Sequence, residues 1–460
     1  MKLVFVHGWS VTNTNTYAGL PLALAKACAE TGFDLSIEHI YLGRYISFND
    51  AVTLDDISRA FDRALRDLPD NDGDTLGEFS CVTHSTGGPV VRNWVDRFYG
   101  ADKLSSLPLK HLIMLAPANH GSTLAKLGKA RVGRIKAWFA GVEPGQRVLD
   151  WLQLGSDGQW VVNEHHLDYA CAANGFFPFV LTGQGIDRAF YDFLNNYLVE
   201  PGSDGVVRVA GANATYRYLR LVQDTQTVVR NRPVTHELRA SGGVRMPEPV
   251  PLGVYASFSH SGKKMGIMGS VEPQDSDHIV VQDLLRCLRV ETAGEYATRR
   301  SQLADFSAQQ QAGDDTYAML VFSVRDDAGN QIGKDDYDLF LLAGNRYRPD
   351  DLPKGFFKDK QMNDTSGRLV YYVNASRMRD IKDGKLGMRV VARPTDGFSY
   401  YRAGEFRGDG IAVHDMVVPN QTTYIDIELH RFLDTNIFRF GSATEGPINF
   451  KSTRPSGDEV

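Results

Sequence analysis

The chain has 460 residues and a mass of 51.0 kDa, which exceeds what one hydrophobic core usually supports, so we expect at least two domains. With 42% hydrophobic and 23% charged residues, its composition is that of a folded globular protein and excludes a disordered chain. Its 50 Lys and Arg residues against 56 Asp and Glu residues give a net charge of −6, which excludes the overall basic character of a nucleic-acid-binding protein.

The cysteines and the first residues bear on where the chain is made. The four cysteines lie at least 53 residues apart, which excludes a CxxC motif and a dense disulfide framework. The opening MKLVFVHGWS lacks the basic region, long apolar run and cleavage site of a secretory leader, and no stretch has the composition of a transmembrane helix. We therefore expect synthesis in the cytoplasm, and export by a leaderless route stays open.

Up to about residue 290, short apolar runs of strand length alternate with stretches of helical period. This alternation is typical of helices packed on both faces of a mainly parallel sheet. Thr53, with Asp56 three residues later, predicts a capping signal at the start of one helix. The expected strands are 2–6, 35–41, 79–83, 111–115, 177–181 and 252–258, and the expected helices are 17–29, 57–68, 279–288 and one that begins near 88.

Residues 123–170 interrupt this alternation. They include a basic amphipathic stretch in which Val132, Ile135, Phe139 and Val142 share one face. An insertion of this length between two strands is too long for a simple loop. We expect a helical insertion, and the sequence leaves open whether it is a mobile lid or a static cap.

The pattern changes after residue 290, so we assign residues 1–290 to a first domain. Residues 291–315 are polar and predict a helical linker at a domain boundary. From 316 to 445, short apolar or β-branched runs are separated by turn residues, which favours an antiparallel β-sandwich-like domain. Residues 446–460 are expected to form a flexible tail.

The sharpest local feature is the run from Phe79 to Gly88, in which an apolar strand meets small residues and then a helical pattern. A serine on such a tight strand-to-helix turn exposes its hydroxyl above the sheet, near a helix N-terminus. This is the setting of a nucleophile elbow, with Ser85 as the nucleophile. Here the sequence resembles the α/β-hydrolase superfamily, in a TxSxG form in which Thr83 replaces the first glycine of GxSxG, as in some lipases.

A second motif supports this resemblance. The segment VFVHGW, residues 4–9, reads as a strand followed by the His-Gly-X loop that precedes the first helix in such hydrolases. Acyl transfer needs backbone N–H donors directed at the developing oxyanion, and the resemblance implies that Trp9 and Thr86 supply them. The segment PANHGS, residues 117–122, resembles one found in lipases related to lecithin–cholesterol acyltransferases and to the deacylases of glycosylphosphatidylinositol anchors. The resemblance covers about residues 2–290.

A serine nucleophile needs a base and an acid that orients the base, and α/β-hydrolases supply them in the chain order Ser, acid, His. The expected acid is Asp204, in a segment SDGVV that is similar to one in many bacterial lipases; Asp187 is the alternative. The expected base is His260, which directly follows the last strand of the first domain. His278 comes later, just ahead of a helix, and stays open as the alternative base.

The remaining motifs predict no further chemistry. His84 is expected to point elsewhere on the turn, and His7 and His120 to shape the oxyanion and lid-entry loops. Because no motif has the spacing of a zinc or EF-hand calcium site, we expect no metal and no cofactor. A calcium ion that steadies the His loop stays open.

Together the residues predict a serine ester hydrolase, and the resemblance implies a lipase or phospholipase that cleaves lipid acyl esters through an acyl-enzyme. A polyester or thioester hydrolase, a non-catalytic binding protein on the same scaffold, and an antibacterial lipase effector exported without a leader stay open. The expected partner is a lipid or another acyl ester, with peripheral membrane contact and no nucleic acid. The oligomeric state is not predicted, and the β-rich domain is expected either to dock on lipid or to be structural or partner-binding.

Overall fold

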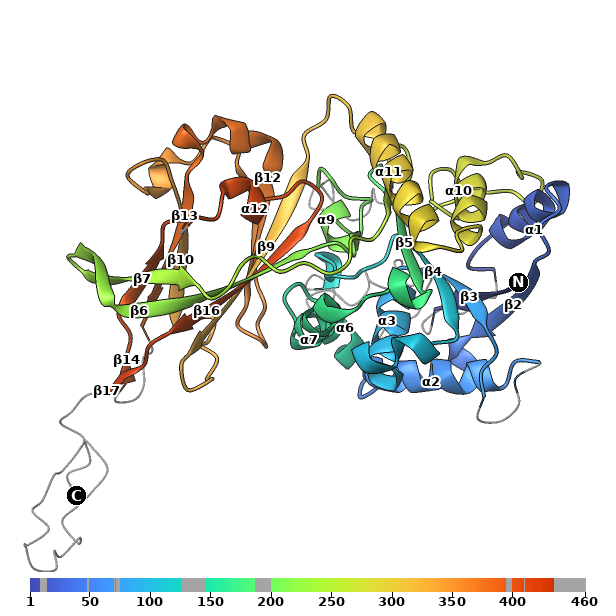
Figure 1. The fold of residues 1–460 in the computed structure, drawn as a ribbon, viewed down its shortest axis with the longest axis horizontal. Helices are drawn as coiled ribbons and strands as arrows, with labels where there is room; N and C mark the ends of the chain where they lie inside the picture. Colours follow the sequence, from blue (N-terminus) through green and yellow to red (C-terminus); the bar gives the residue numbers. More distant parts are fainter. Residues whose placement is uncertain are drawn as a thin grey trace, which may run out of the picture.

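We describe a computed structural model of the chain over residues 1–8, 15–47, 49–69, 71, 75–125, 145–186, 200–393, 399–408 and 410–433. An α/β part that contains the N-terminus lies beside a β-rich part (Figure 1). None of the described helices is long and apolar enough to cross a membrane. Trp9, Asp187, the amphipathic stretch 132–142 and the predicted tail lie outside the described residues.

The α/β part is built on a six-stranded sheet in which every neighbouring pair is parallel. All six strands predicted from the sequence are present. In spatial order they are β2 (Ser36–Tyr41), β1 (Lys2–His7), β3 (Phe79–His84), β4 (Leu109–Leu115), β5 (Phe177–Gly183) and β8 (Leu252–Tyr255). Strands β1, β3, β4 and β5 are buried along nearly their whole length because helices cover both faces of the sheet.

Two helical layers enclose this sheet, each with its own hydrophobic core. The capping box predicted for one helix is confirmed: Asp56 N–H donates to Thr53 Oγ1 over 3.2 Å, and Thr53 N–H donates to Asp56 Oδ2 over 3.0 Å. The parallel sheet between two helical layers confirms the α/β-hydrolase core expected from the sequence. One layer comprises α1 (Leu20–Glu30), α10 (Ile279–Leu288) and α11 (Ala293–Gln310), and the other comprises α2 (Leu54–Arg66), α3 (Gly87–Phe98) and α6 (Gln146–Leu152).

The second half of the predicted insertion is helical and packed. It contains α6, α7 (Asp157–His165) and the short helix η3 (His166–Asp168), and another short helix, η4 (Ala172–Asn174), directly follows it. Val148, Leu149 and Leu152 of α6 are buried in the core between the sheet and α2 and α3. This half of the insertion therefore packs into the core of the α/β domain.

The β-rich part is a single nine-stranded sheet. It is mixed, because β7 and β15, β6 and β16, and β9 and β16 pair in parallel while the remaining pairs are antiparallel. A short pair, β14 (Ser399–Tyr400) and β17 (Phe432–Leu433), lies outside it. The nine strands in spatial order are β10 (Tyr337–Ala343), β13 (Leu386–Ala392), β15 (Ala403–Phe406), β7 (Val234–Ala240), β6 (Arg217–Asn231), β16 (Thr422–Leu429), β9 (Tyr317–Asp326), β12 (Leu369–Asn374) and β11 (Phe357–Met362).

This arrangement differs from the predicted boundaries in two respects. Strands β6 and β7 lie within residues 1–290 but belong to the nine-stranded sheet. The predicted linker is largely α11, whose Tyr296 and Leu303 are buried against the six-stranded sheet. Neither β6 nor β7 is among the predicted strands, and the sheet that an element joins or packs against depends on partners remote in the sequence.

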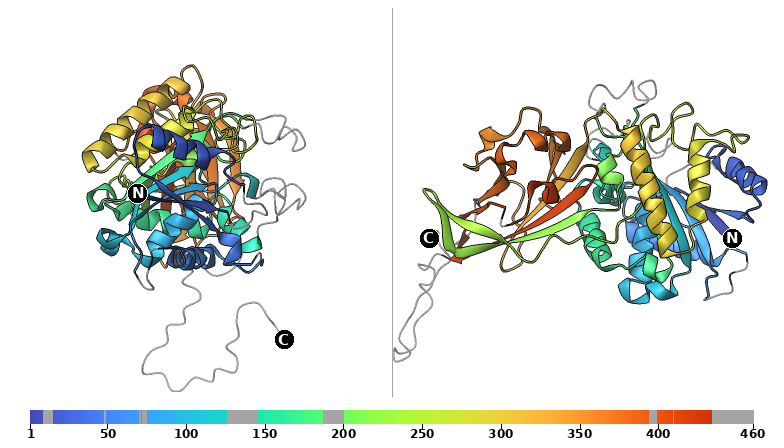
Figure 2. Two further views of the ribbon diagram at one scale, coloured as in Figure 1. Left: turned by 90° about the vertical axis from the view of Figure 1, so that its right-hand side faces the viewer. Right: turned by 45° about the horizontal axis from the view of Figure 1, so that its top comes forward.

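The two parts meet through an aromatic cluster. Strand β9 is buried on both faces: Tyr317, Met319 and Val321 join this cluster, while the alternate residues face the core of the second domain. Trp160 of α7 packs edge-on against Tyr424 of β16, with ring centroids 5.1 Å apart. Strands β6 and β16 run outward from this boundary to the far end of the second domain (Figures 1 and 2).

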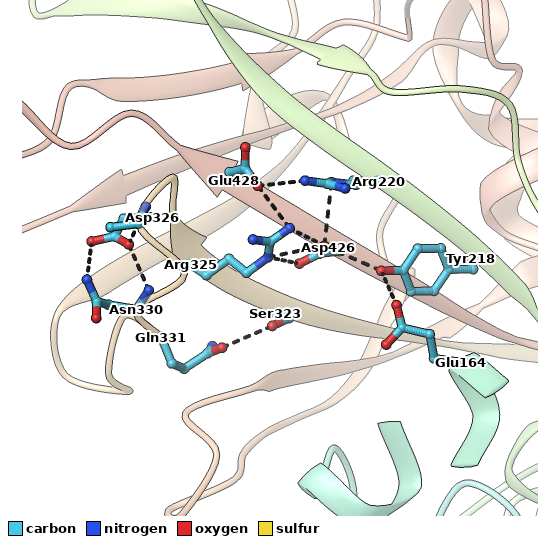
Figure 3. Close-up of polar contacts among 11 residues, drawn as sticks. Glu164, Tyr218, Arg220, Ser323, Arg325, Asp326, Asn330, Gln331, Asp426 and Glu428 are labelled. Carbon is cyan, nitrogen blue, oxygen red and sulfur yellow. Dashed lines mark hydrogen bonds and ion pairs between the residues drawn. The ribbon is translucent and has the colours of Figure 1, made fainter. Parts of the chain in front are cut away.

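A polar network continues from the boundary across the middle strands of the second sheet (Figure 3). Arg325 on β9 contacts both Asp426, over 3.1 Å, and Glu428, over 2.9 Å, on β16. Tyr218 on β6 lies between Asp426 and Glu164 of α7, with its hydroxyl 3.4 and 3.3 Å from their carboxylates. The network therefore joins three strands of the second domain to a helix of the first.

Candidate active site

Ser85 occupies the turn between β3 and α3, with a backbone φ of 54°. This left-handed conformation is costly for a residue with a Cβ atom, and such strain is concentrated at functional sites. The turn is also crowded, because a Cβ added to Gly87 would lie 3.2 Å from Thr83 Cβ and one added to Gly88 would lie 2.8 Å from Pro117 Cβ. A threonine is accommodated at position 83 because the residue that it faces is a glycine.

The histidine loop after β8 brings His260 to this serine. His260 Nε2 lies 3.0 Å from Ser85 Oγ, and His260 Nδ1 lies 2.9 Å from Asp204 Oδ2. With the ring proton on Nδ1, His260 donates to the carboxylate and accepts the serine hydroxyl proton in a hydrogen bond. The three side chains are largely shielded from water, with 9% of Ser85, 1% of His260 and none of Asp204 exposed.

Asp204 is held by its own turn. Its Oδ1 accepts hydrogen bonds from the backbone N–H groups of Val206, over 2.9 Å, and Val207, over 2.7 Å. Gly205 has a φ of 93°, which a glycine adopts without strain. The Asp-Gly dipeptide thus forms a tight turn, and the same turn points its second carboxylate oxygen at His260.

The alternative base lies elsewhere. His278 is the N-cap of α10, where its Nδ1 accepts the Val280 N–H over 3.3 Å and its ring stacks on Phe258. The structure therefore brings Ser85, His260 and Asp204 together and keeps His278 apart from them. Asp187 and Trp9 lie outside the described residues, while Thr86 is the N-cap of α3, where the first backbone N–H groups lack partners within the helix.

His84 contacts His260, which the sequence analysis did not predict. Its Nε2–H donates to the backbone carbonyl of His260 over 3.1 Å, and the two rings lie 4.6 Å apart. Burial, and then the charge of His260, lower the pKa of His84 well below its usual value, so His84 stays neutral. The available signal in the sequence was its position beside Ser85.

Two other histidines that the sequence singled out are buried and neutral. Burial and then His39 lower the pKa of His7 to about 3, and the two rings are joined by a 2.9 Å hydrogen bond. Burial and then the Arg92 guanidinium lower the pKa of His120 to about 3. His120 Nδ1 accepts the hydroxyl proton of Tyr424 over 2.7 Å, so this histidine links the two domains. Within the described ranges, no three His, Cys, Asp or Glu side chains are grouped so as to hold a metal ion.

Comparison with known proteins places this geometry in a family. No family model matches the chain, and no curated protein matches it. Among solved structures, phospholipase PlaB from Legionella pneumophila in complex with thio-NAD matches with a TM-score of 0.86 and 40% identity, over 100% of both chains. A second structure of PlaB matches with a TM-score of 0.85, the same identity and the same coverage.

A lipase of Bacillus licheniformis, BlEst2, is 18% identical and covers 46% of this chain and 78% of its own. Its TM-score of 0.33 is too low to indicate a shared overall fold. The likeness to PlaB, in contrast, extends over both domains. It confirms the resemblance inferred from the elbow and the His-Gly-X loop. The chain therefore belongs to the family of phospholipase PlaB, within the α/β-hydrolase superfamily of serine ester hydrolases.

Proposed function

We propose that the protein is a phospholipase that cleaves acyl esters through a Ser85-His260-Asp204 triad and an acyl-enzyme. The observation that carries the proposal is the continuous chain of hydrogen bonds from Ser85 Oγ through His260 to Asp204 Oδ2. A triad is recognised by this geometry, in which the base contacts the nucleophile and the acid fixes the tautomer of the base.

In the first half of the reaction, Ser85 Oγ attacks the acyl carbonyl carbon while His260 Nε2 takes the hydroxyl proton. The carbonyl oxygen becomes negative, and the Thr86 amide at the start of α3 donates a hydrogen bond to it. The resemblance assigns a second donor to Trp9. Collapse of the tetrahedral intermediate breaks the ester C–O bond, and the leaving alcohol takes the proton from His260.

In the second half, water attacks the acyl-enzyme and loses a proton to His260 Nε2. Collapse of the second tetrahedral intermediate releases the fatty acid and returns the proton to Ser85 Oγ. Asp204 stays ionised throughout and stabilises the imidazolium that forms twice per turnover. No step requires a metal or cofactor, and every proton that moves passes through His260.

The choice of a phospholipid rests on the likeness to PlaB, whose name states that it is a phospholipase. The direct test is release of fatty acid from phosphatidylcholine and phosphatidylglycerol in mixed micelles, measured beside a triacylglycerol and an acyl thioester with the same chain. We expect the phospholipids to be hydrolysed fastest and Ser85→Ala to abolish the activity. Faster cleavage of the thioester would favour a thioester hydrolase, and a folded protein with no activity on any substrate would favour a binding protein.

A further inference from the structure

The turn that carries Asp204 is closed by contacts between the residues on its two sides. Val209 N–H donates to the Gly202 carbonyl over 2.9 Å, and Ser203 and Arg208 form an isolated antiparallel bridge. We refer to residues 200–209 as the Asp204 segment. Because the turn is short, the position of the Asp204 carboxylate relative to His260 depends on how the two ends of this segment are held.

The second domain contacts the N-terminal end of the Asp204 segment. The Tyr372 hydroxyl, on β12, donates to the Pro201 carbonyl over 2.8 Å. Gly202 has a φ of 75°, and a Cβ added to it would lie 2.4 Å from the Tyr317 ring, on β9, and 2.6 Å from the Tyr372 hydroxyl. The Asp204 segment is therefore in direct contact with two stacked tyrosines of the nine-stranded sheet.

The C-terminal end of the Asp204 segment is held by Arg208. Only 2% of its side chain is exposed, and its guanidinium binds both carboxylate oxygens of Glu200, over 2.8 and 2.6 Å, within the same segment. It also binds Asp359 Oδ2, on β11, over 2.6 Å and lies 4.1 Å above the Tyr372 ring. A buried, forked guanidinium contact of this kind fixes direction as well as distance.

From these contacts we propose that the second domain positions the catalytic acid, with Arg208 as the positioning residue and Asp359 as its anchor. The inference rests on the proposed role of Asp204 and extends it, because it makes strands β11 and β12 part of what aligns the triad. The alignment is sensitive, since a displacement of about 1 Å in a reacting group lowers the rate about a hundredfold. The second domain then contributes to turnover even for a substrate that never meets a lipid surface.

Asp359 is the residue to change first. Strand β11 is at the edge of the sheet and 31% of the Asp359 side chain is exposed, so its loss removes the anchor and leaves the cores intact. A matched control is Asp157, on α7, whose carboxylate lies 2.5 Å from the guanidinium of Arg368 in the second domain. This ion pair does not involve the Asp204 segment. Both ion pairs cross the domain boundary, but only one reaches the acid.

The experiment measures kcat and KM of the full-length protein on p-nitrophenyl butyrate, a soluble ester. We expect Asp359→Ala to lower kcat about tenfold with KM unchanged, Asp359→Glu to restore much of the loss, and Asp157→Ala to leave both parameters unchanged. An Asp359→Ala protein with the kcat of the unchanged chain would overturn the proposal. Circular dichroism spectra and melting temperatures verify that each variant is folded.

A double-mutant cycle with Asp204→Asn separates positioning from general destabilisation. If Asp359 acts through Asp204, Asp359→Ala costs nothing further in kcat once the carboxylate is gone. The same fold-loss in both backgrounds would overturn the positioning role. Should Asp359→Ala fail to fold, Arg208→Lys, which keeps the charge but loses the fork, enters the same cycle. An Asp204→Asn protein with full activity would instead contradict the proposed triad itself.

Discussion

The backbone N–H of His260 donates a hydrogen bond to the backbone carbonyl of Asp204 over 2.9 Å. The two loops are therefore joined by their main chains as well as by the 2.9 Å contact between the side chains. Because the main-chain bond does not depend on the carboxylate, the side chain of Asp204 can be altered while the loops stay together.

This bond leads to the first prediction. Asp204→Asn keeps an oxygen for the N–H groups of Val206 and Val207 but presents an amide N–H to His260 Nδ1, which favours the wrong tautomer. We expect kcat to fall about 10,000-fold with little change in the melting temperature. Steady-state kinetics and thermal melts check this. Undiminished turnover, with the loss found instead in Asp187→Asn, would show that the acid assignment is wrong.

The left-handed backbone of Ser85 gives a prediction about stability. Ser85→Ala and Ser85→Gly both remove the nucleophile, but only the glycine variant also relieves the strain at a φ of 54°. We expect the glycine variant to exceed the alanine variant in free energy of unfolding by about 1 kcal/mol. Urea titration of both inactive variants provides the measurement, and equal stabilities would mean that the elbow stores no strain.

His84 gives a prediction about rate. Its Nε2–H donates to the carbonyl of His260, so His84→Phe leaves that carbonyl without this donor and loosens the loop of the base. We expect kcat to fall about tenfold with KM nearly unchanged. His84→Gln keeps a donor on a side chain of similar reach and is expected to retain most of the activity. A phenylalanine variant as active as the glutamine variant would leave His84 without a role in positioning the base.

Buried His120 gives a prediction about pH. Its pKa of about 3 in the folded chain lies below the usual value of about 6.5 that it has when unfolded, so between these limits only the unfolded chain binds the proton. The contribution of His120 to stability is therefore complete above pH 6.5 and falls as the pH falls toward 3, by about 1.4 kcal/mol per pH unit. We expect His120→Gln to have a correspondingly shallower dependence of the free energy of unfolding on pH.

The slope, not the absolute stability, is the quantity to compare, since glutamine alters the contacts to Tyr424 and Asn213 as well. Tyr424→Phe removes one of these contacts but keeps the buried imidazole, and it should keep the slope of the unchanged chain. Urea titrations at several pH values between 7 and 5 provide the measurement. Parallel curves for His120→Gln and the unchanged chain would contradict the prediction.

The strand, turn and helix around Ser85 could be predicted from the sequence because their signals are local. The small residues after β3 reflect steric limits that a neighbouring backbone imposes, as at Gly87 and Gly88. The order Ser, acid, His along the chain then directed attention to Asp204 and His260, which the structure brings together. The choice of Ser85 needed only the residue types around a strand, whereas the choices of Asp204 and His260 also needed the resemblance to α/β-hydrolases.

What the sequence could not predict depends on distant pairing. Arg208 and Asp359 are 151 positions apart, and neither lies in a motif that points to the other. In the same way, β6 is not among the strands predicted from the sequence, and its membership of the second sheet depends on its pairing with β16, about 200 residues later. The role of the second domain was open for this reason, since its contacts with the Asp204 segment exist only in the folded chain.

The central claim is that Ser85 is an activated nucleophile with His260 as its base. Labelling of the purified protein with a fluorophosphonate, read by intact mass and peptide mapping, tests it most directly, because only an activated serine reacts quickly. The account predicts one adduct, on Ser85, that is lost in His260→Ala and retained in His278→Ala. An adduct on another residue, or rapid labelling of Ser85 in His260→Ala but not in His278→Ala, would contradict it.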